Sequence, residues 1–133
     1  MKKNSALTLV AVGALILVNC QGRVKNIDTA DETAASFVIP DDIMAIIDHS
    51  CFGCHNSESR NEKAKKDLKF DELDSMKNFA LIGLLGEIYE HVDSAKMPPP
   101  KFLERNPDRA LTDEQKTLLM NWAAESSDEL SGK

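Results

Sequence analysis

Hydrophobic residues recur at helical spacing in the stretch that follows Pro40-Asp41-Asp42. A proline and two acids suit the first turn of a helix, because proline needs no amide donor there and the acids complement the helix dipole. Three isoleucines then share one helical face with two cysteines. These residues are Ile43, Ile46, Ile47, Cys51 and Cys54. The pattern predicts a helix whose buried face leads directly to the cysteine pair.

A second apolar face is predicted between about residues 71 and 92. Its members are Leu81, Leu84, Leu85, Ile88 and Val92. Gly83 and Gly86 interrupt this face, and each glycine weakens a helix by about 1 kcal/mol relative to alanine. We therefore expect the helix to split in two or to let a neighbouring surface approach closely. The run Met97-Pro98-Pro99-Pro100 ends any helix, because proline lacks an amide donor and restricts the residue before it.

The clearest helix is predicted after Leu111. Thr112 is a suitable N-cap, and Gln115 follows it at the spacing of a capping box. The expected buried stripe consists of Leu118, Leu119, Trp122 and Ala123. Residues 56–69 are almost wholly polar or charged and are expected to form a long surface loop. With no strand pattern and no internal repeat, the sequence predicts an all-α fold.

Residues 1–19 have the features of a secretory signal peptide. Two lysines precede an apolar run over residues 6–18, which is too short for a comfortable membrane span. The run ends in Leu17-Val18-Asn19-Cys20, which resembles a lipoprotein signal, so lipidation is expected at Cys20. The alternative is an ordinary cysteine in a longer, uncleaved anchor. In both cases we expect an exported domain tethered at the periplasmic side of a bacterial membrane.

Charge and composition narrow the classes of partner. The chain has 133 residues, a net charge of −6 and 5% aromatic residues, and loss of Lys2 and Lys3 with the signal brings the charge to about −8. This acidity argues against nucleic acid as a partner. Residues 20–36 are polar and predict a flexible tether, which leaves one domain over residues 37–133. So few aromatic residues suggest a thin core that needs a cofactor.

The candidate chemistry lies in the run Cys51-Phe52-Gly53-Cys54-His55. The Cys-x-x-Cys-His spacing is that of covalent c-type haem attachment. Two sulfurs one helical turn apart can reach the two vinyl groups on one side of a porphyrin, and His55 can place its ring under the iron. A zinc site would need two further ligands, which only His49, His55 and His91 could supply. A thioredoxin-like pair would lie at a strand-to-helix junction of a mixed fold, whereas this chain is helical.

Further segments make the chain resemble a small monohaem cytochrome c, and more narrowly the haem-binding domain family of cytochrome-c-like proteins. In that family the attachment motif is followed by Leu-x-Phe, a helix leading to Met-Pro-Pro, and a final helix that begins at Leu-Ser/Thr and ends in Trp. The matching segments are Leu68-Lys69-Phe70, residues 87–92, Met97-Pro98-Pro99 and residues 111–122. A Pro-Trp-Tyr run common in the family is replaced here by charged residues near 59–66.

The resemblance implies a cytochrome c-like helical domain wrapped around one covalent haem c. Cys51 and Cys54 would form the thioethers, and His55 would be the proximal iron ligand. Met97 is the expected distal ligand, since a thioether beside rigid prolines can be held over the open haem face. Soft sulfur on iron raises the reduction potential relative to two histidines. His91, near the end of the preceding helix, is the alternative ligand.

The function that these expectations define is single-electron transfer by a carrier rather than catalysis by an enzyme. The expected partners are redox proteins with basic docking patches, and no small-molecule substrate is evident. One alternative is a haem-based sensor of small ligands, or a redox-enzyme subunit, in which the sixth position is open or labile. Another is a haem-free structural lipoprotein in which the cysteine pair is incidental.

Overall fold

The computed structural model of the protein describes residues 37–132, of which 66% are helical, with no β-strand among them. The predicted all-α class is therefore confirmed. The predicted signal peptide over residues 1–19, Cys20 and the tether over residues 20–36 lie outside the described residues. No helix within residues 37–132 is long and apolar enough to span a membrane.

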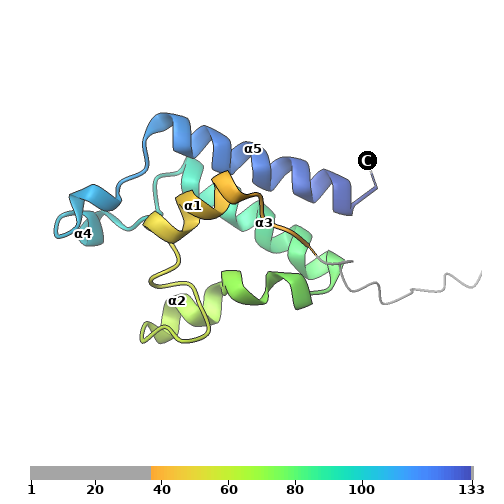
Figure 1. Cartoon of the computed structure of the whole chain (residues 1–133), viewed down its shortest axis with the longest axis horizontal. Helices are drawn as coiled ribbons and strands as arrows, with labels where there is room; N and C mark the ends of the chain where they lie inside the picture. Colours follow the sequence, from red (N-terminus) through yellow and green to blue (C-terminus); the bar gives the residue numbers. More distant parts are fainter. Residues whose placement is uncertain (1–36, 133) are drawn as a thin grey trace, which may run out of the picture.

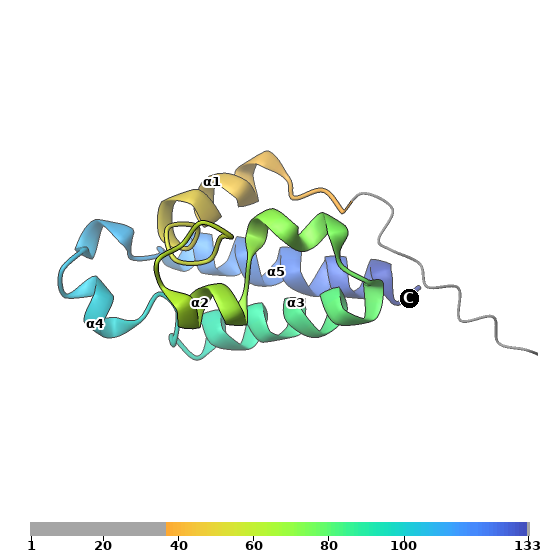
Figure 2. The same cartoon turned by 90° about the horizontal axis from the view of Figure 1, so that it is seen from below.

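Three helices form the body of the domain: α1 (Asp41–Ser50), α3 (Asn78–Asp93) and α5 (Asp113–Leu130). Figures 1 and 2 show α3 and α5 lying side by side and running in opposite directions, with α1 packed against α5. The shorter elements are α2 (Glu62–Asp67), the 3₁₀ helix η1 (Phe70–Ser75), α4 (Pro100–Leu103) and the 3₁₀ helix η2 (Pro107–Arg109). The segment with α4 projects from one end of the body (Figure 2).

The core lies where the three long helices meet and is closed by η1. Its buried side chains are Ile43, Ile46 and Ile47 of α1, Leu81, Leu85, Ile88 and Val92 of α3, Leu119, Trp122 and Ala123 of α5, and Phe70 and Leu73 of η1. Burial of each large apolar side chain contributes about 1.5–3 kcal/mol relative to exposure. The apolar faces read from the sequence therefore hold the fold together.

Two leucines of the predicted stripes are not fully buried, whereas Trp122 is buried as predicted. Leu118 is 41% exposed, so its prediction as a buried residue was wrong. It precedes Leu119 by one position, and a rotation of about 100° per residue carries it to the flank of α5. Leu84 is half-buried because it faces a cavity. Trp122 packs against Phe37, with ring centroids 6.1 Å apart, and is a core residue.

The ends of α1 and α5 agree with the sequence pattern. α1 begins at Asp41, directly after Pro40. At the start of α5 the Thr112 hydroxyl accepts the Gln115 amide at 3.1 Å, and the Gln115 side-chain oxygen accepts the Thr112 amide at 2.9 Å. These reciprocal bonds complete the predicted capping box.

The prediction for the second helix was wrong in its start and in its continuity. α3 begins at Asn78 rather than near residue 71, and it runs unbroken through Gly83 and Gly86. A Cβ added at either glycine would meet no atom within 4 Å, so no neighbouring surface approaches closely there. The helix persists because its opposite face is buried against α5, which outweighs the weak propensity of two glycines.

The predicted surface loop over residues 56–69 was also wrong, since it contains α2. The Asn61 side chain caps this helix by accepting the Ala64 amide at 3.1 Å. The Asp71 carboxylate then ties the start of the segment to η1 by accepting the Ser57 amide at 3.0 Å and the Ser57 hydroxyl. These bonds, with the hydroxyl foremost, lower the pKa of Asp71.

Candidate functional site

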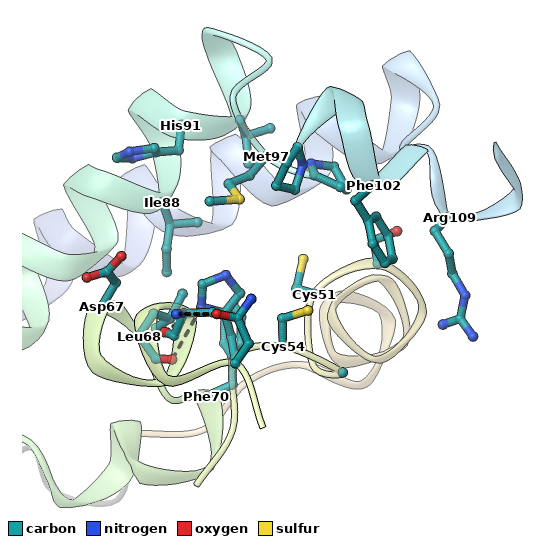
Figure 3. Close-up of a pocket in the computed structure, with 18 of the residues that line it drawn as sticks. Cys51, Cys54, Asp67, Leu68, Phe70, Ile88, His91, Met97, Phe102 and Arg109 are labelled. Atoms are coloured by element: carbon teal, nitrogen blue, oxygen red, sulfur yellow. Dashed lines mark hydrogen bonds between the residues drawn. The ribbon is translucent and has the colours of Figure 1, made fainter. Parts of the chain in front are cut away.

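A cavity of about 690 Å³ lies between the end of α1, α2, α3 and the segment that follows α3 (Figure 3). Its walls combine apolar side chains with thiol, imidazole and thioether groups. They include Cys51, Cys54, His55, Leu68, Phe70, Leu84, Ile88, His91, Val92, Met97, Phe102 and Leu119. The volume lies within the range of about 300–1,000 Å³ that is usual for cofactor and ligand sites.

Cys51 and Cys54 lie on the turn that directly follows α1. The amides of Cys54 and His55 donate to the Cys51 carbonyl at 3.0 and 3.1 Å, which closes a helical turn. Both thiols are free, half-buried and at the cavity wall. Burial, with a smaller contribution from Cys54, raises the pKa of Cys51 to about 12, so this thiol stays protonated at neutral pH. The turn presents two thiols to one space.

His55 is the buried member of the motif, with 8% of its surface exposed. Its Nδ1 lies 3.1 Å from the carbonyl oxygen of Ala64 and 3.3 Å from that of Leu68. Because a carbonyl oxygen can only accept, Nδ1 carries the hydrogen and Nε2 keeps a free lone pair. A hydrogen bond of this kind orients a histidine ligand and raises its basicity toward a metal.

The acceptors for His55 come from α2 and the residue after it, which sequence reasoning missed. Ala64 and Leu68 act through backbone carbonyls, so their side chains give no sign of the role. The available signal was Asn61, a good N-cap residue, followed by the helix-forming run Glu62–Lys66. The Phe70 amide also donates to the His55 carbonyl at 3.1 Å, which fixes the backbone of His55.

Met97 lines the cavity from the end of α3. This helix ends in a Schellman motif, in which the Lys96 amide donates to the His91 carbonyl at 2.9 Å and the Ala95 amide to the Val92 carbonyl at 3.1 Å. Ala95 adopts the left-handed conformation, with φ 51°. The Met97 amide donates to the same His91 carbonyl at 3.1 Å. Figure 3 shows the Met97 side chain extending into the cavity.

Two other histidines line the same cavity. His91 Nδ1 donates to the Glu87 carbonyl at 2.8 Å, one turn earlier on α3, which leaves Nε2 free. His49 Nε2 donates to the Asp108 carbonyl at 2.6 Å, so that nitrogen is already engaged. The structure thus brings Met97 and His91 to one cavity with Cys51 and His55, and it does not separate the two candidates for the distal ligand.

Three charged side chains at the cavity carry no sequence motif: Asp67, Glu87 and Arg109. They come from α2, α3 and η2, and only the packing of these elements brings them to one cavity. Asp67 pairs with Lys63 at 3.2 Å. Arg109 is the one lysine or arginine among the described residues that line the cavity.

The donor set fits a haem. A porphyrin needs apolar walls and an iron needs axial ligands, and this cavity combines leucine, isoleucine, valine and phenylalanine side chains with His55 Nε2 and Met97. The thiols of Cys51 and Cys54 line the same cavity. Within residues 37–132, no group of three or more histidine, cysteine, aspartate or glutamate side chains could hold a metal ion, so the cysteine pair is not part of such a cluster there.

The fold is helical, and the side chains of its cavity suit a haem. Residues 61–125 match the model of the haem-binding domain family, which confirms the family named from the sequence. The matched range begins after the Cys51–His55 motif and contains α2, Met97 and the start of α5. No curated protein and no solved structure matches the chain significantly.

Proposed function

We propose that the protein is an exported monohaem c-type cytochrome that carries single electrons through a His/Met-ligated iron. One observation carries the proposal. The two thiols of a Cys-x-x-Cys-His motif, the free Nε2 of His55 and the thioether of Met97 belong to one largely apolar cavity in a chain with a haem-binding domain. The proposal goes beyond haem binding in three respects: covalent attachment, axial ligation by His55 and Met97, and electron transfer.

Each side chain has a distinct part in this proposal. Cys51 and Cys54 hold the porphyrin through two thioether bonds, each formed when a thiol S–H adds across a vinyl C=C, so no oxidant or leaving group is required. His55 gives its Nε2 lone pair to iron while the Ala64 carbonyl holds the ring. Met97 supplies sulfur as the sixth ligand. Bound haem supplies an iron that takes one electron from a donor protein and passes it to an acceptor.

The apolar walls also support electron transfer. Leu84, Ile88 and Val92 line the α3 side of the cavity with apolar side chains. A dry surrounding disfavours the more highly charged ferric state, which raises the reduction potential together with a methionine ligand. No side chain needs to gain or lose a proton during the electron transfer, so the site suits a carrier.

The proposed location and partners of the protein are inferred from its sequence. The apolar run before Cys20 supports export and a lipid anchor at that cysteine, on the periplasmic side of a bacterial membrane. The acidic charge supports redox partners with basic docking patches, and partner reduction then slows as salt rises. Mass spectrometry of the mature amino terminus tests the anchor: a lipid-modified Cys20 supports it, and an unmodified terminus after another residue contradicts it.

Visible spectra of the protein, produced in a bacterium with haem-attachment machinery, test the proposed ligands. We expect a low-spin haem with the methionine-to-iron charge-transfer band in the ferric state. Met97→Leu removes that band, whereas His91→Ala keeps it. Met44→Leu is a matched control, because Met44 is half-buried in α1 and does not line the cavity.

The opposite results contradict the ligand assignment. A band that survives Met97→Leu excludes Met97, and a low-spin spectrum lost with His91→Ala assigns the ligand to His91. Carbon monoxide binding by the native reduced protein favours the alternative function, a sensor or enzyme subunit with an open or labile sixth position.

A further inference from the structure

The segment that follows Met97, residues 98–110, forms part of the cavity wall, and Pro98 at its start is its one buried residue. Neither α4 nor η2 contains a buried residue, and these two elements pack against each other. The backbone hydrogen bonds donated by amides of this segment go to carbonyls of the same segment. Even so, Pro98, Phe102 and Asn106 line the cavity. Beyond Pro98, contacts other than burial in the core must therefore keep this wall in place.

Two reciprocal hydrogen bonds join the segment to the end of α1. His49 Nε2 donates to the Asp108 carbonyl at 2.6 Å, and Arg109 Nη1 donates to the His49 carbonyl at 2.5 Å. The His49 carbonyl is among the last four of α1, which have no partner within the helix. A guanidinium at this position also complements the negative end of the helix dipole. The contact of Arg109 with the end of α1 is therefore favourable both as a hydrogen bond and as a charge interaction.

We propose that His49 and Arg109 form a clasp that holds residues 98–110 closed over the cavity and so keeps Met97 in its ligand position. Both are positioning residues, since neither ligates iron in this account. The segment is fixed at one end by the Met97 amide on the His91 carbonyl, and the clasp fixes its other end. Figure 3 places Phe102 and Arg109 along the same side of the cavity. The inference rests on the proposed function, in which Met97 binds iron.

Breaking the clasp is expected to open the segment without unfolding the domain. A net hydrogen bond contributes about 1 kcal/mol, so loss of either bond raises the open population about fivefold. An open segment releases Met97 and lets an added ligand reach the iron. The ferric protein then binds imidazole more tightly, and amides of residues 98–110 exchange faster with solvent.

The test uses the haem-loaded protein with His49→Ala, Arg109→Ala and Arg109→Lys. Arg105→Ala is the matched control, because Arg105 is an exposed arginine of the same segment that does not line the cavity. We expect about fivefold tighter imidazole binding and about fivefold faster exchange over residues 98–110 in His49→Ala and in Arg109→Ala. Arg109→Lys is expected to raise imidazole affinity and amide exchange less than Arg109→Ala does. Arg105→Ala is expected to resemble the unsubstituted protein. Exchange of the core amides of α3 stays unchanged, which separates local opening from global unfolding.

The clasp is wrong if His49→Ala and Arg109→Ala leave both readouts unchanged, or if Arg105→Ala has the same effect as they do. An effect of Arg109→Ala without one of His49→Ala also overturns it, because that pattern assigns the role to the charge alone. Failure of the proposed ligand is distinguishable. The unsubstituted protein could lack the methionine-to-iron band while exchange over residues 98–110 still rises in His49→Ala and Arg109→Ala. That result would support closure by the clasp and overturn Met97 ligation.

Discussion

Substitution of Ala95 tests how the end of α3 directs the chain toward Met97. Its φ of 51° lies in the left-handed region, which the Schellman motif requires at this position. This conformation costs a residue with a Cβ about 1–2 kcal/mol. Glycine avoids that cost but loses about 0.5–1 kcal/mol more backbone entropy on folding. We therefore expect Ala95→Gly to stabilise the domain by about 0.5–1 kcal/mol.

Ala124→Gly is the matched control for this prediction. Ala124 is exposed in the interior of α5, where glycine is expected to destabilise by about 1 kcal/mol. Replacement of alanine by glycine is thus expected to raise the free energy of unfolding at position 95 and to lower it at position 124. Urea unfolding of the haem-loaded protein, followed by circular dichroism, measures both differences. If Ala95→Gly destabilises the domain as much as Ala124→Gly does, the left-handed turn before Met97 is not the source of strain that we infer.

Further predictions concern the core, α2 and the Ser57–Asp71 contact. Leu85 is fully buried, so Leu85→Ala should lower the free energy of unfolding by about 2–5 kcal/mol in urea titrations, and a loss under 1 kcal/mol would contradict its place in the core. Asn61→Ala removes the cap of α2 and should cost about 1 kcal/mol and speed amide exchange across α2, and unchanged exchange there would argue against the cap. The lowered pKa of Asp71 means that its carboxylate stabilises the fold above its unfolded pKa and that this contribution disappears as pH falls through the folded value. Asp71→Asn should therefore be less stable than the unsubstituted protein at pH 7 and equally stable in strong acid, and a difference that persists in acid would contradict the role of the charge.

Much of the fold could be predicted because its long helices are amphipathic. The isoleucines of α1 and the stripe of α5 lie at regular spacing, and the Thr112 capping box has a local sequence signature. The errors arose where tertiary packing outweighs local propensity. Burial of the Leu81–Val92 face keeps α3 continuous through its glycines. The polar stretch before it forms α2 because a cap and one buried alanine suffice for a short helix.

Part of the candidate site could likewise be predicted from the sequence, and part could not. Cys51, Cys54, His55 and Met97 could be named from the sequence because their side chains and spacing carry the signal. The groups that hold them could not. The Ala64 and Leu68 carbonyls belong to the backbone, and the contact of Arg109 with His49 joins positions that are far apart in the sequence. Only the packed structure brings these supporting groups to the candidate site.

The most direct test of covalent haem binding is the mass of the denatured protein after production with haem-attachment machinery. The account predicts that the mature chain carries the mass of one haem and stays coloured after denaturation, and that the double variant Cys51→Ser, Cys54→Ser loses both properties. An unsubstituted protein that releases its haem on denaturation, or has none, would contradict the central claim.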